Sequence, residues 1–139
     1  TCALPIYIQE VDCSGAHILL VEDNEINREI AAEMLQMTGA VIDTAENGQE
    51  AFERFLDSPT GYYQMIFMDI QMPQMDGYKA TQTIRNLPDK DKACIPIIAM
   101  TANAFQEDAE KCIAVGMNAH LAKPLDIEKM KKTIKSVCS

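Results

Sequence analysis

The sequence has 139 residues, 47% hydrophobic and 24% charged, and this balance predicts one globular domain with a single substantial core. Asp and Glu number 21 against 12 Lys and Arg, and the net charge of −9 argues against direct binding to the phosphate backbone of a nucleic acid. No apolar run approaches the roughly 20 residues of a membrane-spanning helix, so we expect no membrane contact from this domain.

Residues 1–15 show only weak apolar periodicity, which Pro5 and Gly15 interrupt. A short strand is one interpretation of this segment; a linker or the tail of a preceding domain is the other, with the globular domain at 16–139. The start lacks both the basic region of a signal peptide and an initiator Met, which fits a chain excised from a longer one. The five cysteines form no Cys-x-x-Cys pair, so we expect reduced thiols and a cytoplasmic location.

Strand and helix patterns then alternate five times. Short apolar runs typical of strands buried on both faces lie at 17–21, 41–45, 64–68, 96–100 and 119–122. Helical spacing follows each of them, at 26–37, 48–56, 78–87, 105–115 and 126–137, and residues 88–92 are predicted to form a charged loop. This alternation predicts a doubly wound α/β sandwich in which helices cover both faces of a parallel sheet.

Polar residues follow the predicted strands where each one ends. Glu22 and Asp23 follow the first strand, Asp69 the third, Thr101 the fourth and Lys123 the fifth. Each of them taken singly is equally well explained as a helix cap or a solvated charge, and for Asp69 alone a cap or turn is favoured. The carboxyl ends of parallel strands share one edge of the sheet, however, so the five groups are expected to meet there. Their convergence favours a functional site.

The chemistry of this set narrows the function. Three carboxylates repel one another unless a cation lies among them, and a ligand set of oxygen atoms without His or Cys favours Mg²⁺. A lysine and a hydroxyl beside such an ion can neutralise a phosphoryl group in transfer. Asp69 would be the nucleophile, forming an aspartyl phosphate, and an ionised carboxylate needs no general base.

The sequence resembles a response-regulator receiver domain of two-component phosphorelays, over residues 16–138. The resemblance rests on four motifs: Val21-Glu22-Asp23-Asn24, Met68-Asp69-Ile70-Gln71-Met72-Pro73 with Met75-Asp76-Gly77, Met100-Thr101-Ala102, and Lys123-Pro124. The first and third, which continue as Glu-Asp-Asn-Glu-Ile-Asn and Thr-Ala-Asn-Ala, are similar to receivers fused to hybrid histidine kinases. The resemblance implies a flavodoxin-like fold with five helices and a five-stranded parallel sheet in the order 2-1-3-4-5.

The resemblance also implies roles for the metal and acceptor residues. Asp69 matches the phosphoacceptor and Asp23 the direct Mg²⁺ ligand. Glu22 matches the acidic partner of that ligand, which often acts through water. Gln71 matches the position whose backbone carbonyl completes the metal shell.

Further roles concern the phosphoryl group and the conformational switch. Thr101 matches the switch hydroxyl, the backbone N–H of Ala102 a phosphate contact, and Lys123 the lysine that pairs with the acceptor or its phosphate. A cis peptide bond is expected before Pro124. One residue departs from the family pattern, because His120 stands where a Tyr or Phe usually couples to the threonine. Either His120 has no switching role, or it swings inward when Thr101 moves, with a pH dependence.

The expected function is that of a signalling receiver. A phosphohistidine on a histidine kinase or a histidine phosphotransfer domain would supply the phosphoryl group, and a phosphorylation-dependent dimer is compatible with this role. The isolated domain is not expected to be an enzyme beyond catalysing its own phosphotransfer and slow dephosphorylation. A phosphorylation-independent pseudo-receiver is the alternative, against which the complete set of site residues argues.

Two other classes fit the residues less well. A phosphatase of the haloacid-dehalogenase type needs a second Asp two residues after Asp69 as its general acid, and Gln71 stands there. A flavodoxin-like electron carrier needs a phosphate-binding loop after the first strand, and Glu22 and Asp23 would repel a phosphate.

Overall fold

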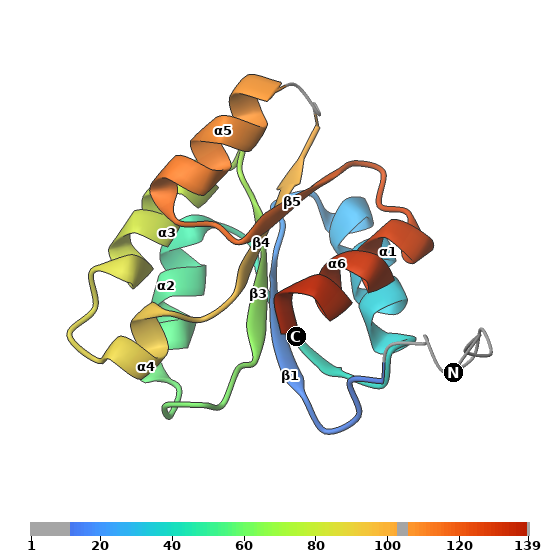
Figure 1. Cartoon of the computed structure of the whole chain (residues 1–139), viewed down its shortest axis with the longest axis horizontal. Helices are drawn as coiled ribbons and strands as arrows, with labels where there is room; N and C mark the ends of the chain where they lie inside the picture. The colour runs from blue at the N-terminus through green and yellow to red at the C-terminus, as the bar shows by residue number, and fades with distance from the viewer. Residues whose placement is uncertain (1–11, 103–105, 139) are drawn as a thin grey trace, which may run out of the picture.

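The computed structural model describes residues 12–102 and 106–138, so most of the 1–15 segment lies outside the described residues. Five parallel strands form one sheet in the order β2-β1-β3-β4-β5, as the resemblance implies (Figure 1). The strands are β1 (His17–Val21), β2 (Val41–Ala45), β3 (Met65–Asp69), β4 (Ile97–Thr101) and β5 (Ala119–Ala122).

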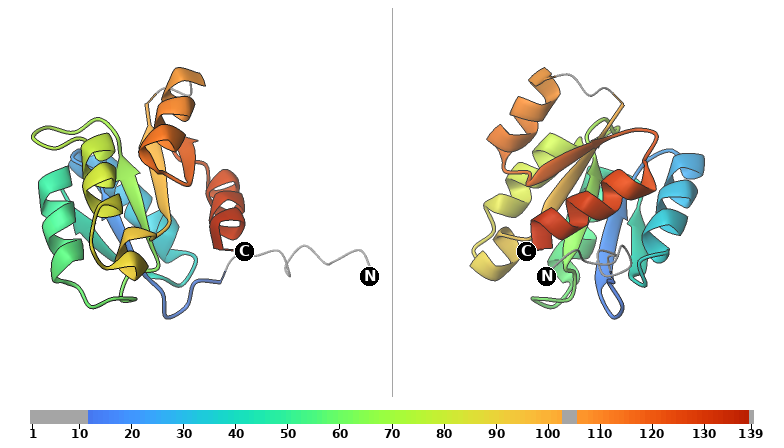
Figure 2. Two further views of the ribbon diagram at one scale, coloured as in Figure 1. Left: turned by 60° about the vertical axis from the view of Figure 1, so that its left-hand side comes forward. Right: turned by 45° about the vertical axis from the view of Figure 1, so that its right-hand side comes forward.

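Helices cover both faces of this sheet (Figures 1 and 2). They are α1 (Glu25–Gln36), α2 (Gly48–Asp57), α3 (Gly77–Arg85), α4 (Lys90–Ala93), α5 (Gln106–Val115) and α6 (Ile127–Cys138). Helices α1 and α6 pack on one face, and α2, α3 and α5 on the other. The predicted doubly wound architecture is confirmed, although helix ends differ from the prediction by one or two residues.

The central strands β1, β3 and β4 are buried, except for His17 at the start of β1, because both of their faces are covered. Leu19 and Val21 of β1 pack under α2, α3 and α5, whereas Ile18 and Leu20 pack under α1 and α6. Every residue of β3 and β4 is buried as well. Such strands have apolar side chains at successive positions instead of the alternation of a half-exposed strand, which is why their pattern could be recognised.

The segment 88–92, predicted to be a charged loop, instead contains the short helix α4. Asp89 caps it by accepting hydrogen bonds from the backbone N–H groups of its first turn. Lys92 is buried, and its ammonium donates to the carbonyl oxygens of Leu56 at 2.9 Å and Ser58 at 2.7 Å, at the end of α2. The lysine thus satisfies carbonyl groups that a helix end leaves unpaired, which explains why this charged segment is ordered and partly buried.

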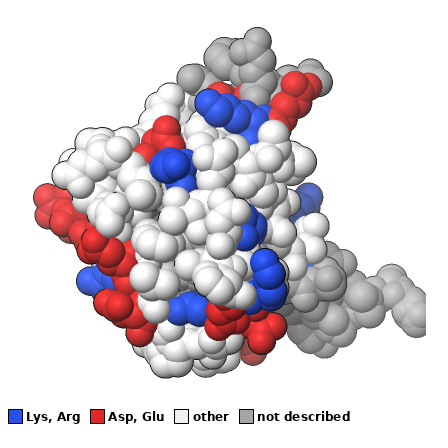
Figure 3. All heavy atoms as spheres, turned by 90° about the vertical axis from the view of Figure 1, so that its left-hand side faces the viewer, with Lys and Arg blue, Asp and Glu red and all other residues white. Residues whose placement is uncertain are grey.

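The charge distribution is mixed on the face formed by α2, α3, α4 and α5. On the described atoms of this face, Lys and Arg side chains are scattered among Asp and Glu around a broad uncharged area (Figure 3). None of the described helices is both long and apolar enough to span a membrane.

Candidate metal and phosphoryl site

Three carboxylates meet at the carboxyl edge of the sheet. Glu22 and Asp23 follow β1, Asp69 is the last residue of β3, and each offers an oxygen atom within 4.8 Å of the other two. Glu22 and Asp69 are each only 2% exposed, whereas Asp23 is exposed. Two buried carboxylates and one open to solvent form a site that a hydrated divalent cation can enter and that suits its preference for oxygen ligands.

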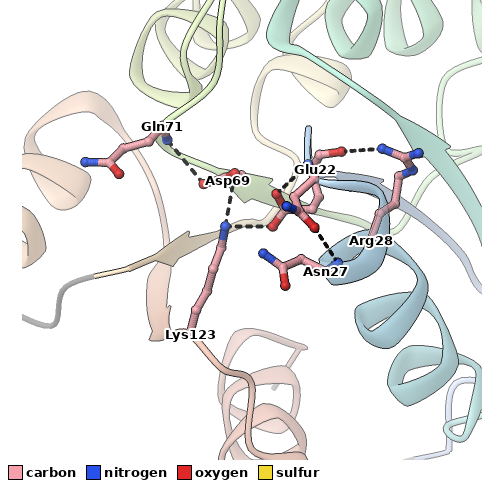
Figure 4. Close-up of polar contacts among 7 residues, drawn as sticks. Glu22, Asn27, Arg28, Asp69, Gln71 and Lys123 are labelled. Atoms are coloured by element: carbon pink, nitrogen blue, oxygen red, sulfur yellow. Dashed lines mark hydrogen bonds and ion pairs between the residues drawn. The ribbon is translucent and has the colours of Figure 1, made fainter.

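Lys123 reaches the two buried carboxylates from the loop after β5. Its ammonium lies 2.6 Å from Glu22 Oε1 and 3.0 Å from Asp69 Oδ2 (Figure 4). The backbone N–H of Lys123 donates to the carbonyl of Thr101 at 2.7 Å, which ties the end of β5 to the end of β4. The peptide bond between Lys123 and Pro124 is cis. One ammonium therefore serves two carboxylates, and negative charge remains in excess.

The pKa of Asp69 is raised from its ordinary value of 3.8 to about 7. Burial is the largest cause, and the neighbouring Glu22 carboxylate adds to it, while Lys123 opposes both. Burial alone would lower the pKa of Lys123, but its contacts with Glu22 and Asp69 raise that pKa on balance. A divalent cation among the carboxylates would offset the repulsion from Glu22 and favour the ionised form of Asp69. The donor set of this structure therefore fits Mg²⁺.

The loop after Asp69 is held close to the strand. The backbone N–H of Gln71 donates to Asp69 Oδ1 at 3.2 Å, so the exposed Gln71 side chain takes no part in that contact. A Cβ atom on Gly77 would lie 2.4 Å from the carbonyl oxygen of Asp69, so only glycine fits there. Asp76 caps α3 by accepting a hydrogen bond from the N–H of Lys79 at 2.8 Å. A tightly packed turn therefore fixes the Asp69 carboxylate.

Thr101 and Ala102 lie at the same edge. Thr101 ends β4 and is buried, and Asp69 pairs with its neighbour Met100 in the strand register. Ala102 follows and is exposed. The structure therefore brings all the residues of the predicted site to one edge, while the roles of these residues stay predictions.

His120 lies on the same side of the sheet as Thr101. In the β4–β5 register it pairs with Ala99, which belongs to the core under α2, α3 and α5, whereas Leu121 points toward α1 and α6. His120 is half-buried. Its position fits either interpretation of this departure from the family pattern, and its switching role stays a prediction.

The sequence pattern did not single out Arg28, which contacts the backbone of Glu22 and not its carboxylate. Its guanidinium Nη1 donates to the backbone carbonyl of Glu22 at 3.0 Å. Asn24, noted only as part of a motif, caps α1, and its own N–H donates to Glu22 Oε2 at 3.1 Å. Helical periodicity gives no signal for Arg28, because the contact depends on how the turn between β1 and α1 brings its side chain back to the strand end.

Residues 18–135 match the family model described as the response regulator receiver domain. The chain belongs to this family. It is similar to hybrid signal transduction histidine kinase B of Dictyostelium discoideum, with 44% identity over 117 residues, and to the osmosensing histidine protein kinase SLN1 of Saccharomyces cerevisiae, with 40% identity over 130 residues. These matches cover 78% and 91% of the chain but only 6% and 10% of the two kinases. The receiver therefore corresponds to a small part of such proteins.

Two solved structures are informative about the site. The receiver domain of a sensor histidine kinase from Pseudomonas aeruginosa, with magnesium in its active-site cleft, has a TM-score of 0.78 and 36% identity, covering 89% of this chain and 98% of that one. A co-crystal structure from Saccharomyces cerevisiae contains the histidine phosphotransfer protein Ypd1 and the receiver domain of Ssk1. Its match has a TM-score of 0.80 and 31% identity, covering 91% of this chain and 90% of that one.

Proposed function

We propose that this receiver domain takes a phosphoryl group from a phosphohistidine onto Asp69, with Mg²⁺, as one step of a phosphorelay. The observation that carries the proposal is the meeting of three carboxylates within 4.8 Å of one another beside Lys123. Asp23 and Asp69 are the proposed direct ligands, with Glu22 acting through water and the Gln71 carbonyl completing the shell. When bound, the ion supplies positive charge to the phosphoryl oxygens.

The residues of the chain supply the remaining chemistry. A carboxylate oxygen of Asp69 forms the new bond to phosphorus, the phosphorus–nitrogen bond of the phosphohistidine breaks, and its electron pair returns to the imidazole nitrogen. The ammonium of Lys123 is close enough to Asp69 to neutralise a phosphoryl oxygen there. The Thr101 hydroxyl and the Ala102 N–H are the proposed contacts for the other oxygens. Movement of Thr101 would start the conformational change.

The site lacks one component of a turnover phosphatase. Gln71, two residues after Asp69, carries an amide that cannot act as the general acid and base of a hydrolytic cycle. Its side chain is exposed, and only its backbone contacts the acceptor. We therefore propose that the isolated domain stores a phosphoryl group, transferring and slowly losing it, and is not an enzyme acting on a separate substrate.

The partner surface that we propose lies on α1. Ile26 and Ile30 of this helix are 68% and 52% exposed, and Met37, which caps its carboxyl end, is 70% exposed. Ile30 also lines a groove of about 60 Å³ that runs to Lys123 and Leu125. A partner seated on this apolar strip would therefore lie next to the acceptor. The Ypd1 complex of a structural neighbour supports a histidine phosphotransfer domain as the occupant, and the histidine kinase relatives support a kinase as the alternative.

We propose that the parent protein is a hybrid histidine kinase, with residues 16–139 as its cytoplasmic receiver and 1–15 as a linker or the tail of a preceding domain. The kinase relatives support this assignment. No contact with nucleic acid or membrane is expected from this acidic domain. A phosphorylation-dependent dimer stays a prediction.

Intact mass after incubation with acetyl phosphate and Mg²⁺ tests the proposed acceptor. The wild-type domain should gain one phosphoryl group, and the Asp69→Asn variant should gain none. Omission of Mg²⁺ should also abolish the gain. If neither acetyl phosphate nor phosphorylated Ypd1 labels the wild-type domain, the interaction-only pseudo-receiver is the correct interpretation.

A second experiment tests the docking surface. Ile30→Glu should slow phosphotransfer from phosphorylated Ypd1 by at least about tenfold, because it places a charge in an apolar interface. The same variant should react with acetyl phosphate at the wild-type rate. Ile113→Glu is the matched control, because Ile113 is 60% exposed on α5, away from the proposed surface. Equal slowing by the two variants would place the partner elsewhere.

A further inference from the structure

Arg28 connects the metal-site turn to the neighbouring strand. It lies in α1 with a side chain only 16% exposed, and its Nη1 donates to the Glu22 carbonyl at 3.0 Å. Its Nη2 lies 3.6 Å from the carboxylate of Glu46, which follows β2 and is 65% exposed. Arg28 and Lys123 approach Glu22 from opposite sides (Figure 4).

Arg28 takes the place of a strand partner for the Glu22 carbonyl, because the hydrogen bonds between β1 and β2 end just before it. The N–H of Glu22 still donates to the carbonyl of Ala45 at 3.1 Å, but β2 ends at Ala45. Beyond this point Arg28 supplies the donor for the Glu22 carbonyl, and its second arm extends to the residue after β2. A guanidinium holds two acceptors in the plane of a rigid fork, a geometry that the ammonium of a lysine does not reproduce.

The hydrogen bond from Arg28 to the Glu22 carbonyl affects the direction of the Asp23 carboxylate. Both carboxylate oxygens of Glu22 are held, one by Lys123 at 2.6 Å and the other by the N–H of Asn24 at 3.1 Å. Asp23 is exposed, and within the described part of the chain its carboxylate makes no hydrogen bond. Its direction therefore depends on the backbone between Glu22 and Asn24. Repulsion among the three carboxylates acts to push this turn outward when no cation is bound.

We propose that Arg28 is a positioning residue for the cation site, holding the Glu22–Asp23 backbone so that the Asp23 carboxylate is aimed before Mg²⁺ arrives. This inference rests on the proposed role of Mg²⁺. Arg28 has two effects of opposite sign on cation binding. Its charge repels the cation, whereas its hydrogen bond fixes the ligands. Removing the side chain tests which effect is larger.

The experiment is a calorimetric Mg²⁺ titration of the unphosphorylated domain, with NMR amide shifts of Glu22 and Asp23 as a second readout. Arg28→Met should raise the Kd for Mg²⁺ about tenfold, the size typical of lost outer-shell partners of metal ligands. Arg28→Lys keeps the charge but loses the two-armed geometry, and it should raise the Kd about threefold. Glu46→Gln removes only the exposed ion pair and should leave the Kd within about twofold of wild type.

Stability must be separated from positioning. Ile84→Val removes one methyl group from the core at a distance from the turn and should lower stability without changing the Kd. If Arg28→Met leaves the Kd unchanged or tightens binding, the positioning role is wrong and charge repulsion is the larger effect. If Arg28→Met does not fold, an unchanged Kd in Arg28→Lys overturns the inference equally.

These outcomes are distinct from failure of the proposed function. A wild-type domain that binds Mg²⁺ and is phosphorylated, with Arg28 variants that bind it equally well, would overturn the inference on Arg28 alone. A wild-type domain that binds no Mg²⁺ would overturn the proposed metal site and the role of Arg28 together.

Discussion

Asp69→Asn should stabilise the folded domain in the absence of Mg²⁺, and the gain should grow with pH. The substitution keeps the shape of the side chain but removes a charge that is buried beside Glu22. It does not leave Lys123 unpaired, because the ammonium keeps its 2.6 Å contact with Glu22. The structure therefore predicts that the Asp69 carboxylate, the proposed phosphoacceptor, is held at a cost in stability.

The magnitude follows from the pKa of Asp69. This pKa is 3.8 in an unperturbed carboxyl group and about 7 in the folded domain. Between these values the folded state holds a proton that the unfolded chain has lost, so stability decreases as pH rises through this window. Each pKa unit corresponds to about 1.4 kcal/mol, which gives a penalty of roughly 2 kcal/mol at pH 5 and roughly 4 kcal/mol at pH 8. Asp69→Asn should recover most of this difference.

Urea unfolding of both proteins at pH 5 and pH 8 without metal measures the effect. Asp57→Asn is the control, because it removes an exposed carboxylate from the end of α2 and should change stability by less than about 0.5 kcal/mol at either pH. Added Mg²⁺ should narrow the gap, since it stabilises only the ionised wild-type site. The reasoning would be refuted if Asp69→Asn were less stable than wild type at pH 8. It would also be refuted if the stability difference between the two proteins were the same at pH 5 and pH 8.

Three further predictions concern Mg²⁺ binding, the turn after Asp69, and Arg85 at the edge of the sheet opposite the site. Mg²⁺ affinity should rise between pH 6 and pH 8 as Asp69 loses its proton, and calorimetry in buffers of different ionisation enthalpy should detect proton release; a pH-independent affinity would contradict this. Gly77→Ala should lower the free energy of unfolding in urea by more than about 3 kcal/mol, because the added Cβ would overlap the backbone of Asp69. A loss below about 1 kcal/mol would show that the turn can move. Arg85→Met should cost about 3 kcal/mol, because Arg85 donates to one acceptor at the end of α4 and to two in the loop before β5. Mg²⁺-dependent labelling at the opposite edge of the sheet should persist.

The sheet was predictable because its central strands are apolar at successive positions. The end of the third strand was less predictable, because the apolar run placed it at Met68. Asp69 is in fact the last residue of β3, paired with Met100 and 2% exposed. The sequence indicates where an apolar run stops, but a carboxylate can remain in a strand when a lysine from a distant segment compensates its burial. Here that residue is Lys123.

Long-range contacts also explain what the sequence did not reveal. Helix α4 depends on Lys92 reaching the end of α2, more than thirty residues earlier in the chain. Four residues of mostly charged sequence give no periodicity from which such a helix could be predicted. Arg28 has the same explanation, because its contact with Glu22 is set by a turn and not by a repeat. Both features depend on a cationic side chain, Lys92 or Arg28, that donates to backbone carbonyl groups.

The contacts of Lys123 indicate how occupancy of the site can affect β4. The ammonium is shared between Glu22 and Asp69, and a phosphoryl group on Asp69 would bring further negative charge to it. The backbone N–H of the same lysine donates to the Thr101 carbonyl at 2.7 Å. A shift of Lys123 toward the phosphoryl group would therefore be felt at the end of β4, where the proposed switch hydroxyl lies. Lys123 thus links the buried Asp69 carboxylate to the backbone of β4, and we expect phosphorylation to change how its ammonium is divided among its anionic partners.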